Sequence, residues 1–86
     1  MIDKGMFCHS YVIKFAYRQS GGHPFPFQGK LKVVVPASRV LTPEDARNLV
    51  IWAYTDVYQT PLTEEEKKTL MVLNYEYTRK IWCTAV

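Results

Sequence analysis

Residues 7–19 read FCHSYVIKFAYRQ and alternate along their length. The odd positions carry Phe, His, Tyr, Ile, Phe and Tyr, and the even positions up to residue 18 carry Cys, Ser, Val, Lys, Ala and Arg. Successive side chains of a strand point to opposite faces, so this period of two predicts a half-buried β-strand. Two glycines, Gly21 and Gly22, end it, because glycine pairs are typical of turns.

A second alternating segment covers residues 30–35 and predicts another strand. Its valines and leucine face the core, its lysines face away, and Pro36 ends it. The loop between the two strands is too short and too rich in proline and glycine for a crossover, so the pair is predicted to form an antiparallel hairpin.

A helix is predicted from Pro43 to about Tyr58. Thr42 suits the N-cap, Pro43 suits the first helical position, and the carboxylates that follow complement the helix dipole. Pro61 marks the break after it. Trp52 and Tyr54 flank the expected buried stripe. That stripe consists of Ala46, Leu49, Val50, Ala53 and Val57.

The last third of the chain is ambiguous. Thr63 and Glu66 predict a capping box and a new helix, which reaches Cys83 if the apolar spacing is followed, yet residues 75–82 are strand-preferring types. We favour a short helix to about Met71 and then a strand, because a hairpin alone is marginal in water. The prediction is a single α+β domain over residues 1–86, in the order β-β-α-α-β, with a three-stranded sheet of strand order 2-1-3 packed against one long and one short helix. The alternative is ββαα with a long C-terminal helix.

Charge and cysteine usage limit the location and the partners. Eleven Lys and Arg against eight Asp and Glu give a formal charge of +3, a mild bias towards anionic partners. Matching the apolar faces of the first and last strands puts Cys83 beside Phe7 rather than Cys8, so we expect two free thiols and no disulfide. Reduced thiols, no apolar run long enough for a membrane and no signal-like start predict a cytoplasmic protein without a membrane partner.

The residue types that catalysis and cofactor binding require are sparse. The two histidines, His9 and His23, are the only candidate bases near neutral pH, and Cys8 points to the opposite strand face from His9. No metal-ligand spacing and no glycine-rich phosphate loop occurs, and the acidic clusters fall in first helical turns. We therefore expect no catalytic residues, no metal, no cofactor and no enzymatic activity.

Two features favour binding. Strand parity collects four cations on the hairpin surface away from the core, which we call the basic face: Lys14, Arg18, Lys30 and Lys32. Lys80 is expected to extend it, with Arg79 on the core side. Phe25 and Phe27 lie in a proline-stiffened loop, where they either cap the core or stand out as anchors for a partner.

These features predict a non-enzymatic module that binds a protein partner through the basic face and the aromatic loop. The format, a very small β-β-α-β-like domain without a motif, resembles accessory proteins of phages and plasmids, including inhibitors of host defence. The alternative is an RNA-binding or single-stranded-DNA-binding domain, in which the cations meet phosphates and exposed rings stack on bases. A homodimer would also compensate for the small core.

Overall fold

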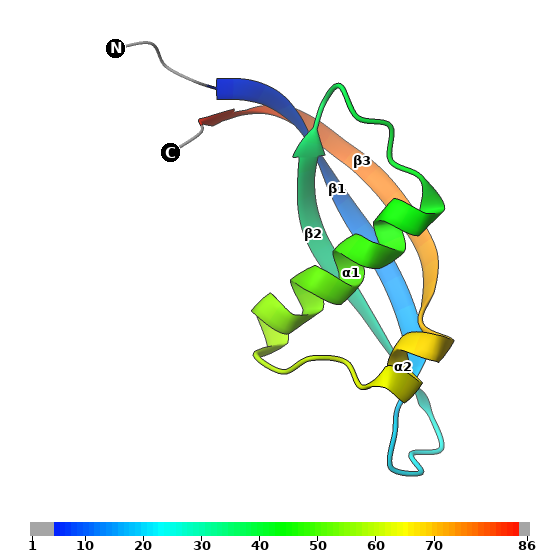
Figure 1. Ribbon diagram of the computed structural model, residues 1–86. Helices are drawn as coiled ribbons and strands as arrows, with labels where there is room; N and C mark the ends of the chain where they lie inside the picture. Colours follow the sequence, from blue (N-terminus) through cyan, green and yellow to red (C-terminus); the bar gives the residue numbers. More distant parts are fainter. Residues whose placement is uncertain (1–4, 85–86) are drawn as a thin grey trace.

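The chain runs in the order β-β-α-α-β in the computed structural model, which describes residues 5–84. The three strands form one antiparallel sheet in the order β2-β1-β3, with α1 lying across one face of it (Figure 1). This confirms the predicted architecture, and the alternative with a long C-terminal helix is wrong. The elements are β1 (Gly5–Arg18), β2 (Pro26–Pro36), α1 (Pro43–Tyr58), α2 (Glu64–Thr69) and β3 (Met71–Thr84).

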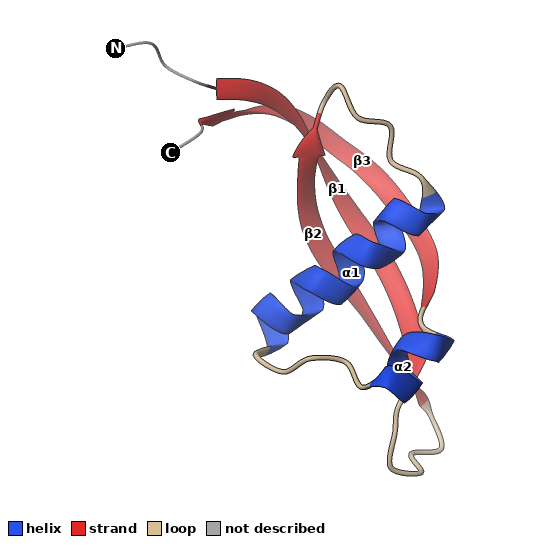
Figure 2. Cartoon of the chain, in the orientation of Figure 1, coloured by secondary structure: helices blue, strands red, loops and turns tan. Residues whose placement is uncertain are grey.

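The sheet is longer than the helical layer that covers it. β2 ends at Pro36, which lies opposite Cys8, so the first residues of β1 pair with β3 alone. Figure 2 shows this two-stranded ribbon extending past β2 and past both helices towards the termini. Helical cover is therefore concentrated on the part of the sheet nearer the β1–β2 loop.

α1 begins as the sequence predicts. The Thr42 hydroxyl accepts a hydrogen bond from the Asp45 N–H at 3.1 Å, and the Asp45 carboxylate accepts one from the Thr42 N–H, which completes a capping box. The buried residues of α1 are Ala46, Val50, Ala53 and Tyr54. Within residues 5–84, no helix is both long and apolar enough to cross a membrane.

The end of α1 differs from the predicted buried stripe. Val57 is 59% exposed, whereas Tyr54 is buried and stacks on Tyr58 with ring centroids 4.4 Å apart. Both tyrosines also meet the ring of Phe27 at the start of β2 edge to face. The aromatic side of the last turn therefore faces the sheet, because large rings reach the strand where Val57 does not.

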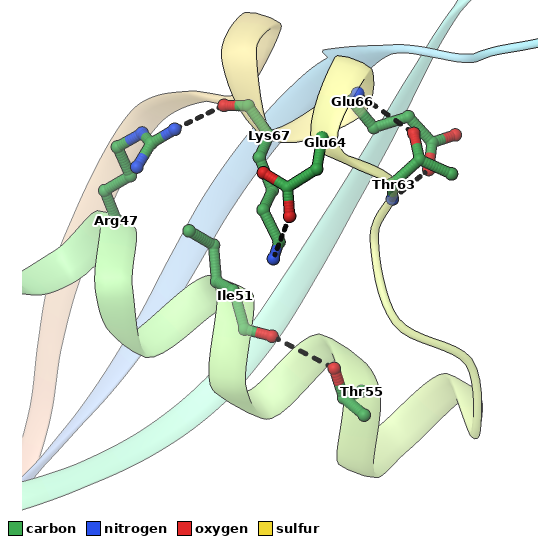
Figure 3. A network of polar contacts seen from close by, with 7 residues as sticks. All are labelled: Arg47, Ile51, Thr55, Thr63, Glu64, Glu66 and Lys67. Atoms are coloured by element: carbon green, nitrogen blue, oxygen red, sulfur yellow. Dashed lines mark hydrogen bonds and ion pairs between the residues drawn. The ribbon is translucent and has the colours of Figure 1, made fainter.

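Figure 3 shows how α2 is attached to the rest of the molecule. Thr63 and Glu66 form the predicted capping box, and the Arg47 guanidinium of α1 donates a hydrogen bond to the Lys67 carbonyl of α2. The Glu66 carboxylate also accepts a hydrogen bond from the Ser20 N–H at 3.3 Å. Hydrogen bonds from the Thr63 and Ser20 backbones hold the pKa of Glu66 below its ordinary value. A six-residue helix is thus fixed at both α1 and the β1–β2 loop.

An aromatic cluster forms the core beneath α1 near the loop end. Phe15 is fully buried, and its ring lies parallel to that of Tyr17 with centroids 6.4 Å apart. The hydroxyls of Tyr17 and Tyr54 lie 2.7 Å apart, so each buried phenol finds a polar partner. Burial, with this hydrogen bond, raises the pKa of Tyr17 well above its ordinary value of 10.0.

The raised pKa predicts a loss of stability in alkali. Because the folded chain holds the Tyr17 proton more tightly than the unfolded chain does, this contribution is constant below about pH 10 and falls as the pH rises further. The free energy of unfolding should fall above pH 10 by up to about 1.4 kcal/mol per pH unit from this group. Urea titrations between pH 8 and pH 11 measure it. Tyr17→Phe should show a shallower slope, and equal slopes would contradict the assignment.

Candidate partner-binding surface

The outer face of the sheet, opposite α1, carries the predicted basic face. All four of its cations are exposed, and they occupy even-numbered positions of β1 and β2. Lys14 lies directly opposite Lys30, Lys32 lies opposite Val12, and Arg18 lies opposite Pro26. Among residues 5–84, ion pairs join only Arg39 to Asp45 and Lys67 to Glu64, so none of the four is neutralised within the described chain.

The Lys14 and Lys30 pair is unfavourable in isolation. Like charges directly opposite each other on an antiparallel pair destabilise a sheet, because their side chains are close. A hollow of about 260 Å³ opens beside them and is lined by Lys14, Phe15, Gln28, Gly29, Lys30 and Leu73. A carboxylate or phosphate entering this hollow would meet two ammonium groups and an apolar wall. The outer face therefore places two cations beside a hollow.

The third strand adds Arg79 to the basic face and removes Lys80 from it. Arg79 lies opposite Ser10 on the outer face, whereas Lys80 lies opposite His9 and its Nζ is 5.0 Å from the centre of the Phe7 ring. The opposite prediction was wrong. Register shifts leave Thr78 unmatched in β3, and a single extra residue reverses the face of every residue beyond it.

The two loop phenylalanines point to different places. Phe27 is half-buried and stacks on Tyr17 with ring centroids 5.2 Å apart, so it belongs to the core cluster. Phe25 is 75% exposed, and its carbonyl accepts a hydrogen bond from the Gln19 side chain. Phe25 also lies next to Pro26, the residue opposite Arg18. Phe25 is therefore much the more exposed of the two phenylalanines.

In the middle of the outer face, the β1 residues are shielded although no helix covers them. Cys8 is 5% exposed and Ser10 is fully buried, between longer side chains on the neighbouring strands. The Ser10 hydroxyl has no hydrogen-bond partner in the described structure. Val34 and Arg79 lie opposite Ser10 on either side. The small residues Cys8 and Ser10 of β1 are thus covered by longer side chains from β2 and β3, whereas the cations of this face are exposed.

A second exposed surface was missed by the sequence reasoning. On the α1 side of the sheet, beyond the helical layer, Phe7 and Trp82 meet edge to face at 4.9 Å and are 53% and 51% exposed. Tyr77 is 48% exposed and meets the rings of His9 and Tyr11. We call these five residues the aromatic stripe. The alternation of β1 placed Phe7, His9 and Tyr11 on the core face, but nothing in the sequence shows where helical cover stops.

The described residues offer little else for chemistry. No three or more His, Cys, Asp or Glu side chains within residues 5–84 gather as metal ligands would. Two of the acidic residues, Asp45 and Glu66, are engaged in helix caps. No protein-family model, no curated protein and no solved structure matches the chain.

Proposed function

We propose that the chain is a non-enzymatic binding module that docks an acidic patch of a protein partner on the outer face of its sheet. The observation that carries the proposal is the unneutralised pair of Lys14 and Lys30, which is costly for the free protein and is relieved by a partner's carboxylate. Lys32 and Arg18 extend the positive charge along the sheet. Phe25 supplies an apolar anchor at the loop end.

The composition of the outer face favours protein over nucleic acid. Single-stranded nucleic acid is held by cations together with rings that stack on bases, and both must lie on one surface. By register, the described side chains of the outer face include no aromatic ring; its apolar residues are aliphatic, such as Val12 and Val34. Among the described strand residues, the register places one acidic side chain there, Glu76 opposite Val12, and a mainly basic and aliphatic surface suits an acidic protein partner. We take the module to act in the cytoplasm, where its thiols stay reduced.

The experiment compares protein capture by matched variants. Tagged wild-type protein is incubated with a nuclease-treated lysate of the source cells, beside the Lys14→Glu/Lys30→Glu double variant. Lys68→Glu, on the exposed surface of α2, is the control for a change of net charge. The proposal expects a protein that the wild type and Lys68→Glu both retain and the double variant loses. Equal retention by all three, or loss of all binding on nuclease treatment, contradicts it.

The single variant Lys30→Glu should affect stability and binding in opposite directions. It replaces a repulsive cross-strand pair by an attractive one, so the free energy of unfolding should rise by about 0.5–1 kcal/mol. Affinity for the captured partner should fall at least ~10-fold, because a like charge then faces the partner's acidic patch. Urea unfolding and titration calorimetry measure the two. A variant that is both less stable and weaker in binding would indicate ordinary structural damage.

Nucleic-acid binding is the second candidate, and the aromatic stripe is the observation that favours it. Exposed rings with Lys80 beside them resemble the combination that stacks bases and contacts phosphates. Oligo(dT) or oligo(U) should then quench the fluorescence of Trp82, with affinity that falls as salt rises. Phe7→Ala should weaken this binding, and Phe25→Ala should not. Absence of quenching at low salt would remove this candidate.

A further inference from the structure

The only two cysteines of the chain come together on the outer face at the terminal end of the sheet. Cys8 in β1 lies opposite Ile81, and Cys83 in β3 lies opposite Met6. Cys8 and Met6 share a face because they are two residues apart, so Cys83 lies on that face too, diagonally across from Cys8. The prediction that Cys83 faces the side of Phe7 was wrong, because the unmatched Thr78 reverses the parity of the last strand segment.

The two cysteines are diagonal neighbours on adjacent strands and differ in exposure. The neighbouring Cys83, together with burial, raises the pKa of Cys8 above its ordinary value. Cys8 is buried, whereas Cys83 is partly exposed, and both are free. An oxidant in solution therefore reaches Cys83 first, and the nearest group that can react next is the thiol of Cys8.

We propose that Cys8 and Cys83 form a redox-active dithiol that peroxides oxidise to an intramolecular disulfide between β1 and β3. The Cys83 thiolate attacks one oxygen of hydrogen peroxide, the O–O bond breaks, and the released hydroxide takes up a proton to become water. The resulting sulfenic acid is attacked by the Cys8 sulfur, which loses its proton as the S–S bond forms and a second water leaves. Two thiols and one peroxide thus give one disulfide and two waters.

The bond requires a small approach of the two strands. Diagonal neighbours on adjacent strands have Cα atoms about 7–8 Å apart, slightly beyond the span of a disulfide, so the strands must approach by roughly 1 Å. The pair lies where β2 ends, since Cys8 is opposite Pro36 and the residues before it pair with β3 alone. A two-stranded ribbon twists more readily than a wider sheet, so the approach needs no change in the core.

The bond would tie the two ends of the chain together. It joins the first strand to the last and encloses almost the whole chain, and a cross-link across a loop of that length restricts the unfolded state strongly. The bond would lie far from Lys14 and Lys30, the pair that carries the proposed partner binding, because these two residues lie towards the other end of the sheet. The proposal is therefore independent of the proposed partner binding.

The test treats reduced, full-length protein with hydrogen peroxide and follows thiol titration, peptide mass mapping and thermal unfolding. We expect loss of both thiols without formation of a dimer, and a peptide pair joined through Cys8 and Cys83 with the loss of two hydrogen atoms. The melting temperature should rise by at least about 10 °C and return to its initial value with dithiothreitol.

Two variants control the experiment. Cys83→Ser changes the partly exposed residue and should fold normally, keep one titratable thiol and show no reversible rise in melting temperature. Cys8→Ser should instead accumulate sulfenic or sulfinic acid on Cys83, because its resolving thiol is gone. The proposal is overturned if wild-type protein carries sulfinic acid on Cys83 while Cys8 stays free, or if its only disulfide joins two chains.

Discussion

The Phe15→Ala variant should lose about 3–5 kcal/mol of unfolding free energy, the largest effect we expect from any single truncation. Phe15 is fully buried, and the rings of Phe27 and Tyr54 lie with centroids 6.1 Å from its own. A side chain built on Gly29 would meet the Phe15 ring at 2.9 Å, so this ring packs directly against the backbone of β2. A close-packed site of this kind leaves a cavity when it is truncated.

The loss would be a large share of the total stability. A chain of 86 residues has roughly 4–13 kcal/mol of unfolding free energy, so the variant should melt at a much lower temperature or fail to fold. Phe7→Ala is the matched control, because Phe7 is the same residue type on the same face of β1 but is 53% exposed. It should cost less than about 1 kcal/mol. Equal losses in urea titrations would contradict the described core.

The second large effect separates Phe25 in the β1–β2 loop from Phe27 at the start of β2. Phe27→Ala should cost about 2–3 kcal/mol of stability, because its half-buried ring contacts Tyr17, Tyr54 and Tyr58. Phe25→Ala should change stability by less than about 0.5 kcal/mol, because that ring is 75% exposed. Circular dichroism during thermal and urea unfolding measures both.

The two variants should rank the other way round in their effect on affinity for the captured partner. Phe25→Ala should weaken the affinity by about 1–3 kcal/mol at unchanged stability, as expected of an exposed anchor. Phe27→Ala, measured at a temperature where it remains folded, should bind almost normally. If instead Phe27→Ala abolishes binding while folded and Phe25→Ala does not, the loop is used differently from the way its exposure indicates.

Periodicity and capping chemistry were enough to predict the hairpin and both helix starts. Odd positions of residues 7–17 and 31–35 supply the core face of the hairpin, and Thr42 and Thr63 mark both helix starts as predicted. The third strand was inferred from residue types and from the need to complete a sheet, and β3 confirms it. These are local signals, and each is strong because the competing structure is physically costly.

The parity of β3 could not be predicted. Leu73 and Thr78 are unmatched against β1, and neither has a sequence feature that distinguishes a bulged position from a paired one. Each extra residue exchanges the two faces, which moved Arg79 to the outer face and brought Cys83 beside Cys8. The cations of the basic face on β1 and β2 could be placed from the sequence because the pairing of these two strands has no register shift.

The length of sheet that the helices cover could not be predicted either. Alternation assigns Phe7 and Phe15 to the same face, yet one is half-exposed and the other fully buried. The difference depends on where α1 crosses the sheet, which is a tertiary property. Val57 shows the same limit, since its spacing fits the buried stripe but the helix presents Tyr54 and Tyr58 to the strand instead.

The irregular pairing of β3 also bears on fibril formation. An outer strand with a regular row of free N–H and C=O groups is a template on which strands of other molecules add one after another. The unmatched Leu73 and Thr78 interrupt that row at two points, and the opposite outer strand carries Lys30 and Lys32 between terminal prolines. Neither edge strand, β2 or β3, therefore has the flat, uncharged row of free backbone groups on which cross-β growth depends.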